Sequence, residues 1–78
     1  MAEYNGRHYY KIDVMVKDGY SFMVSSLNRL PYEEDALDIA WDLQAFEFDD
    51  DVNYAVVDDL VSVHDIEHFI ECGYCYQY

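Results

Sequence analysis

Residues 31–51 read PYEEDALDIAWDLQAFEFDDD, and this stretch decides how the rest of the chain is arranged. At a helical spacing of about 100° per residue, its apolar side chains gather on one side of an amphipathic helix. This apolar face consists of Tyr32, Ala36, Ile39, Ala40, Leu43 and Phe46. We expect the helix to hold Pro31 in its first turn, to stop near Phe48 and to lie on a small sheet.

A second apolar group, made of Leu37, Trp41 and Phe48, lies roughly 140° around the same helix. Trp41 has two alternative roles in this arrangement. A buried Trp41 belongs to the core, whereas an exposed Trp41 is a suitable anchor for a partner protein. We expect burial, because an exposed stripe of these three side chains would promote aggregation.

The arc between the two apolar groups is acidic and carries no Lys or Arg. Its carboxylates, and the Asp triplet that follows the helix, are Glu34, Asp35, Asp38, Asp42, Asp49, Asp50 and Asp51. Exposure to water explains where these acids lie, but not why no basic residue is interspersed among them. Carboxylates about 5–6 Å apart resemble the successive phosphates of a nucleic-acid strand. We therefore expect these acids to bind a surface lined with Lys and Arg, with Trp41 as an anchor in the alternative in which it is exposed.

The net charge of the chain is −13 over 78 residues, and it is unevenly distributed. All four Lys and Arg residues lie at or before Arg29, together with three of the 17 acidic residues, and the other 14 acids follow. Solubility of a small domain needs a net charge of only about 2–8 in magnitude. The excess favours a basic protein as partner, and so few basic residues argue against direct binding of nucleic acid.

Upstream of the helix, residues 9–16 and 20–27 alternate between apolar and polar side chains, which predicts two strands joined near Asp18-Gly19. A two-residue loop would pair Val14 with Met23 and mix the two faces. A three-residue loop over residues 17–19 needs a left-handed Gly19 in a bulge. It pairs Val16 with Tyr20, Val14 with Phe22 and Ile12 with Val24. We expect this second register, because it places the large apolar residues on one face.

The remaining segments predict further short elements. Residues 1–8 are expected to be a polar lead-in with a turn at Asn5-Gly6. Residues 53–61 are ambiguous, and their Val residues favour a strand over a helix. Ser62 and Asp65 form a capping box for a second helix that ends at Gly73, and residues 74–78 alternate like a strand. The expected buried stripe of this helix is Val63, Ile66, Phe69 and Ile70.

These elements predict one α+β domain spanning residues 1–78. We expect a small antiparallel sheet, made of the β-hairpin and one or two further strands. The acidic amphipathic helix and the short second helix would cover one face of this sheet.

The spacing of His64, His68, Cys72 and Cys75 is H-x3-H-x3-C-x2-C, which resembles a set of zinc ligands. The alternative is two solvated histidines and two reduced thiols, which we favour because both histidines lie on the polar side of the helix and Cys72 lies about 40° further round it. Cys72 and Cys75 also match a redox C-x-x-C motif. In oxidoreductases that motif opens a helix, whereas here it closes one. We therefore expect no metal and no cofactor.

No motif in the chain indicates a reaction. The Ser residues lack the glycines of a nucleophile elbow, and there is no Gly-rich phosphate loop. The chain is therefore expected not to be an enzyme. It contains no apolar run of about 18 residues and no apolar signal segment, so we expect a cytoplasmic protein, in its own cell or in an infected host.

In size, acidity, lack of a catalytic motif and strand–strand–helix order, the chain resembles phage-encoded anti-CRISPR proteins and other DNA mimics. The resemblance extends over the whole chain in general character and not through a residue motif. It implies a stoichiometric inhibitor that covers a basic nucleic-acid-binding surface, most concretely on a CRISPR–Cas effector. The alternatives are an antitoxin or adaptor that binds a basic protein, and a small zinc-binding domain.

Overall fold

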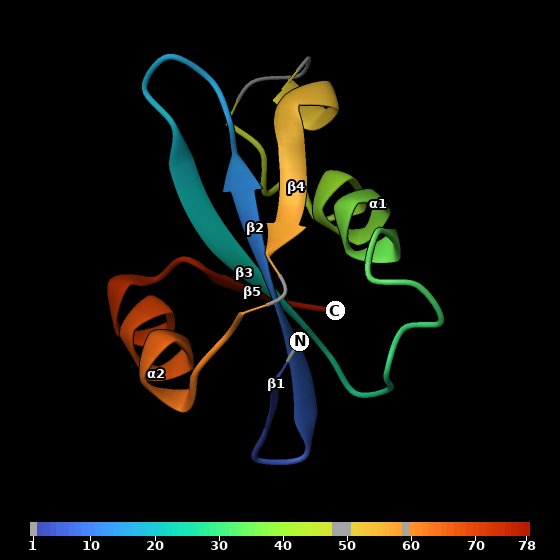
Figure 1. Cartoon of the computed structure of the whole chain (residues 1–78). Coiled ribbons are helices and arrows are strands. Elements are labelled where there is room, and N and C mark those ends of the chain that lie inside the picture. The colour runs from blue at the N-terminus through green and yellow to red at the C-terminus, as the bar shows by residue number, and fades with distance from the viewer. Residues whose placement is uncertain (1, 48–50, 59) are drawn as a thin grey trace.

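The computed structural model describes residues 2–47, 51–58 and 60–78, and for Asp51 it describes only the backbone. Along the chain, the elements are β1 (Ala2–Tyr4), β2 (Arg7–Val14), β3 (Tyr20–Ser26), α1 (Asp35–Asp42), a 3-10 turn η1 (Asp51–Tyr54), β4 (Ala55–Asp58), α2 (Val63–Cys72) and β5 (Cys75–Gln77). Figure 1 shows the two helices on opposite sides of the sheet. The predicted α+β class is confirmed.

Strand β2 lies at the centre of an open five-stranded sheet. One of its edges pairs with β3, and the other edge is shared by β1, opposite Arg7–Tyr9, and β4, opposite Lys11–Val14. The outer strand β5 runs parallel to β3 and pairs Met23 with Cys75. The sheet is therefore mixed instead of antiparallel, and it has three strands beyond the central hairpin instead of one or two.

Strand β1 replaces the predicted polar lead-in. Asn5 and Gly6 have φ angles of 50° and 77°, and the two residues connect β1 to β2 so that Tyr4 pairs with Arg7. Two consecutive positive φ angles are typical of the type I′ turn that joins tight hairpins, and Asn-Gly is the pair best suited to it. The turn at Asn5-Gly6 was predicted correctly, but the strand before it was not.

The predicted register of the central hairpin is wrong by two residues. Val14 pairs with Tyr20, Ile12 with Phe22 and Tyr10 with Val24, and Gly19 is not left-handed. The five residues Met15–Gly19 form the loop, and the Met15 N–H extends the contact with the β4 side of β2 by donating to the Tyr54 carbonyl at 2.7 Å. A slip of two residues keeps every side chain on its predicted face.

Gly19 lies tightly against the backbone of this loop. A Cβ atom at Gly19 would approach the Val14 carbonyl oxygen to 2.9 Å, and backbone atoms cannot move aside as a side chain can. We expect Gly19→Ala to lower the free energy of unfolding by more than about 1 kcal/mol. Denaturant unfolding measures this loss, with the exposed loop variant Asp18→Ala as the control. Equal midpoints for the two variants would contradict this packing.

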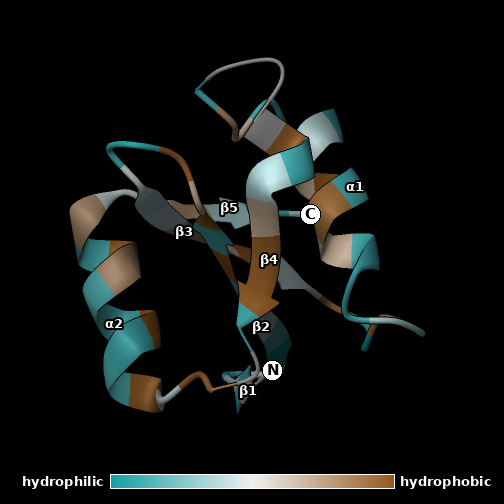
Figure 2. Ribbon diagram, turned by 45° about the horizontal axis from the view of Figure 1, so that its top comes forward, coloured by the Kyte–Doolittle hydropathy of each residue, from teal (hydrophilic) through white to brown (hydrophobic). Residues whose placement is uncertain are grey.

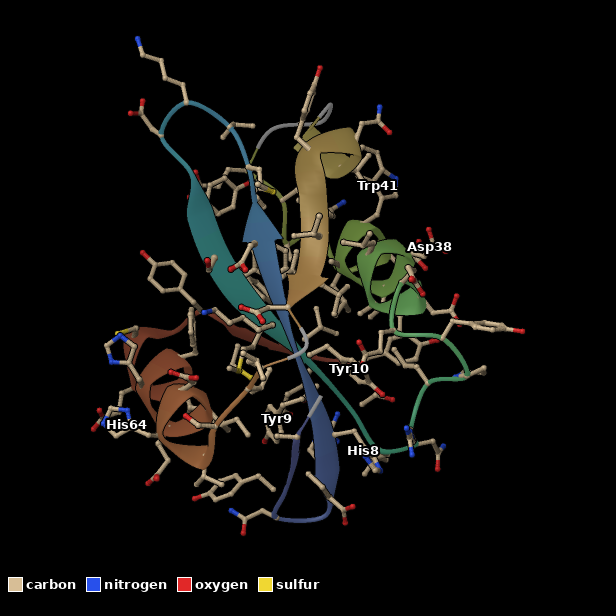
Figure 3. The ribbon with its side chains drawn as sticks, viewed as in Figure 1. His8, Tyr9, Tyr10, Asp38, Trp41 and His64 are labelled. Atoms are coloured by element: carbon tan, nitrogen blue, oxygen red, sulfur yellow. The ribbon has the colours of Figure 1, made fainter. Side chains whose placement is uncertain are left out.

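The two faces of the sheet carry separate hydrophobic clusters. Tyr10, Ile12 and Phe22 pack beneath α1, whereas Tyr9 and Met23 pack with Ile66 of α2. Figure 3 shows Tyr9 and Tyr10 on opposite sides of β2. The prediction that both helices cover one face is therefore wrong, because neighbouring residues of β2 are large on both faces and each face needs its own cover.

Helix α1 is shorter than the predicted span from Pro31 to Phe48. Just before the helix, the N–H groups of Asp35, Ala36 and Leu37 each donate to the carbonyl three residues earlier. Bonds with this spacing form a turn tighter than an α-helix. The helix ends where Gln44 adopts a φ of 56° and the Ala45 N–H donates to the Ala40 carbonyl at 2.9 Å. This is a Schellman ending, with Gln44 in the left-handed position that glycine usually occupies.

Replacing Gln44 with glycine should therefore stabilise the protein. The side chain of Gln44 is exposed, so the change removes backbone strain without opening the core. We expect Gln44→Gly to raise the free energy of unfolding by about 0.5–1 kcal/mol, measured from denaturant midpoints. The control Gln44→Ala keeps a Cβ atom at the same φ and should give no such gain. A stability gain from alanine equal to that from glycine would contradict the role of this φ angle.

The caps predicted for α2 are confirmed. Asp65 N–H donates to Ser62 Oγ at 3.1 Å, the Asp65 carboxylate accepts from Ser62 N–H at 3.2 Å, and Gly73 has a φ of 78°. The hydrogen bond from the Ser62 backbone is the main cause that lowers the pKa of Asp65. Of the expected buried stripe, Ile66 is fully buried and Phe69 half-buried, whereas Val63 and Ile70 are exposed. The predicted strands in residues 53–61 and 74–78 correspond to the shorter β4 and β5.

Candidate functional site

Helix α1 presents most of its acidic residues to solvent. Ala36, Ile39 and Ala40 are buried against the sheet, which turns the opposite side of the helix outward. Figure 2 shows hydrophobic and hydrophilic residues alternating around both helices. Among the acids, Glu34, Asp38 and Asp42 are exposed, and Asp35 is half-buried. Asp38 points away from the sheet (Figure 3).

Trp41 is 46% exposed, so the prediction that it belongs to the core is wrong. Its ring centroid lies 6.3 Å from that of Phe46, which in turn packs edge-on against Phe22 at 5.3 Å. Because α1 ends at Asp42, the chain after the helix places Phe46, and not Trp41, over the sheet. Trp41 therefore stands at the rim of the core, beside the exposed acids of the same helix.

The Asp triplet after α1 was also predicted to bind the partner. Asp49 and Asp50 lie outside the described residues, as does the side chain of Asp51. Phe48, expected on the second apolar group of the helix, lies outside them as well. The described part of the candidate surface therefore consists of Glu34, Asp35, Asp38, Trp41 and Asp42, and we call it the acidic face of α1.

Two basic residues of β2 are engaged on the other face of the sheet, which α2 covers. Arg7 Nε donates to Ser25 Oγ at 2.9 Å, and Arg7 Nη2 donates to the Tyr78 carbonyl at 2.8 Å. Lys11 Nζ lies 3.9 Å from Asp58 Oδ2 and 6.0 Å from the centre of the Phe69 ring. In the described part of the chain, the carboxylates of the acidic face form no ion pair.

The four residues with zinc-ligand spacing do not converge. Among residues 2–47, 51–58 and 60–78, no three His, Cys, Asp or Glu side chains are placed to share a metal ion. His68 Nε2 lies 3.8 Å from Cys72 Sγ, and both cysteines are free. Burial raises the pKa of the Cys75 thiol, against a smaller lowering by Arg7. His64 lies on α2, across the sheet from α1 (Figure 3).

Two hollows were not foreseen from the sequence. An open groove of about 550 Å³ runs along α2, where His64, Glu67, His68 and Glu71 line it. A smaller pocket of about 190 Å³ lies where β3, β5 and the segment after α1 meet, and its lining is mostly aromatic. The signal for the second hollow is the high tyrosine content, nine in 78 residues. Finding it requires the parallel pairing of β5 with β3, which no local pattern indicates.

No protein-family model matches the chain, and comparisons with curated proteins and with solved structures found no match. Within the described ranges, neither helix has the length and the continuous apolar surface needed to cross a lipid bilayer. The assignment of function therefore depends on the residues themselves.

The exposure of Trp41 predicts a small effect on folding. Because about half of the side chain is already in water, Trp41→Ala should lower the free energy of unfolding by less than about 2 kcal/mol. The control is Phe22→Ala, which removes a side chain only 1% exposed and should cost about 3–5 kcal/mol. Chemical unfolding of both variants compares them, and equal losses would place Trp41 in the core after all.

Proposed function

We propose that this protein is a stoichiometric inhibitor whose acidic face of α1 binds a basic nucleic-acid-binding surface of another protein. A CRISPR–Cas effector nuclease is the most concrete partner of this kind. The observation that carries the proposal is the exposure of Glu34, Asp38 and Asp42 beside a half-exposed Trp41. Within the described residues, no basic side chain pairs with these acids.

The cost of this arrangement to the isolated protein favours a binding role. Asp38 and Asp42 are four residues apart on one helix, so their carboxylates repel each other by a few tenths of a kcal/mol. Asp42 also lies at the C-terminal end of α1, where the helix dipole disfavours a negative charge. Lys and Arg from a partner would relieve both effects, and the Trp41 ring supplies apolar contact area beside the charges.

Charge complementarity of this kind acts mainly on the rate of association. Exposed carboxylates attract a basic surface electrostatically over roughly one Debye length, which is about 8 Å at physiological salt. The proposed inhibitor should therefore compete with nucleic acid for its partner and associate more slowly as salt rises. An antitoxin or adaptor that uses the same acidic face would bind a basic protein without competing with nucleic acid, which separates the two functions.

The test is the variant Asp35→Asn, Asp38→Asn and Asp42→Asn, assayed against candidate nucleases at low and high salt. We expect association to slow by about tenfold or more at low salt, and by less at high salt. The unfolding midpoint should stay equal or rise slightly, because repulsion along α1 is reduced.

The matched control is Asp18→Asn, Glu67→Gln and Glu71→Gln, which removes the same charge from exposed positions outside α1. It should retain most of the inhibition. Equal losses in the two variants would show that only net charge matters. Inhibition unchanged by the α1 variant and independent of salt would overturn the proposed function.

A further inference from the structure

The pocket beside β5 is built from three segments that are far apart in sequence. Tyr20 and Phe22 come from β3, Tyr74 and Tyr76 come from the chain around β5, and Glu47 comes from the segment after α1. Phe22 is 1% exposed and forms the floor, whereas Tyr74 is 51% exposed and stands at the mouth. The pocket holds about 190 Å³.

The rings around this pocket are held in different orientations. The Tyr20 ring lies almost parallel to Phe22, with centroids 6.3 Å apart and planes inclined by 26°. The Tyr76 ring stands nearly perpendicular to Phe22, at 5.7 Å and 86°. Each aromatic ring carries partial negative charge on its face, so any ring face that the pocket exposes attracts a cation.

A carboxylate completes the lining. Glu47 is exposed, and its backbone N–H donates to Tyr20 Oη at 3.0 Å, which ties the segment after α1 to β3. Among the described residues that line the pocket, none is basic. The pocket therefore combines aromatic walls with one negative charge, and no positive charge of its own competes for them.

We propose that this pocket binds the guanidinium group of an arginine side chain from a partner protein. A guanidinium is planar, stacks on aromatic rings and loses less hydration than an ammonium group. Glu47 would accept its N–H groups in a charge-assisted hydrogen bond. The source of the arginine rests on the proposed function, whereas the preference for a guanidinium rests on the pocket alone.

The pocket and the acidic face of α1 are joined by a continuous line of rings. Trp41 contacts Phe46 at 6.3 Å, and Phe46 contacts Phe22, the pocket floor, at 5.3 Å. Phe22 also belongs to the cluster that packs against α1. The pocket and α1 therefore lie on the same side of the sheet.

The experiment titrates the isolated protein with methylguanidinium, and with methylurea as an uncharged compound of the same shape. Amide chemical shifts of Ser21 and Ala45, two further residues of the lining, report binding. We expect saturable shifts with methylguanidinium and none with methylurea. Acetyl-arginine methylamide should bind at least about threefold more tightly than the corresponding lysine compound. Equal binding of the lysine compound, or no saturation with either cation, would overturn the proposal.

Two variants test the walls of the pocket, and both change exposed side chains. Glu47→Gln and Tyr74→Leu should each weaken methylguanidinium binding by at least about threefold. The matched controls Glu34→Gln and Tyr54→Leu change an exposed acid and an exposed tyrosine outside the pocket, and should leave binding unchanged. If the controls weakened binding equally, methylguanidinium would be attracted to the acidic surface in general. That result would overturn the proposal that it binds in the pocket.

A further comparison separates this inference from the proposed function. The Asp35, Asp38 and Asp42 variant leaves the pocket residues in place, so it should bind methylguanidinium as the unmodified protein does. Loss of nuclease inhibition without loss of methylguanidinium binding identifies the acidic face as a separate determinant. If no nuclease is inhibited while methylguanidinium still saturates the pocket, the proposed function fails and the pocket assignment stands.

Discussion

The position of β2 at the centre of the sheet is the constraint on which the rest of the structure depends. Both of its edges are paired along its length, and both of its faces carry large buried side chains, with Tyr9 on one face and Tyr10 and Ile12 on the other. A strand of this kind needs cover on both sides. The two helices therefore lie on opposite faces, and each brings a small apolar cluster of its own to the sheet.

This arrangement also separates the charges. Arg7 and Lys11 share the face of β2 that α2 covers, and they are engaged there by Ser25, the Tyr78 carbonyl and Asp58. Helix α1 lies across the sheet from them. The acids of α1 therefore remain uncompensated within the described residues because of the topology, and not only because the chain holds few basic residues. The charge asymmetry visible in the sequence becomes an asymmetry between two surfaces.

Local signals in the sequence were reliable, because each depends on residues within one turn of each other. The caps of α2 at Ser62 and Gly73 and the alternation of the hairpin are examples. The failures involve the ends of elements and contacts between distant segments. The pairing of β4 with β2, opposite Lys11–Val14, joins segments more than 40 residues apart, and no local pattern indicates it. The exposure of Trp41 depends on where α1 ends, and the lining of the aromatic pocket depends on β5 pairing parallel to β3.

The parallel pairing of β5 with β3 has a consequence for folding kinetics. Parallel strands that are distant in sequence bear a large loop-closure entropy, so this pairing is expected to form after the local β2–β3 hairpin. The aromatic pocket needs residues from both strands, and it is therefore complete only in the fully folded molecule. A cation that binds in this pocket binds only the native state. It therefore raises the free energy of unfolding as its concentration increases. Occupancy would suppress detachment of β5 from β3, so a partner would stabilise a pairing that local sequence does not support.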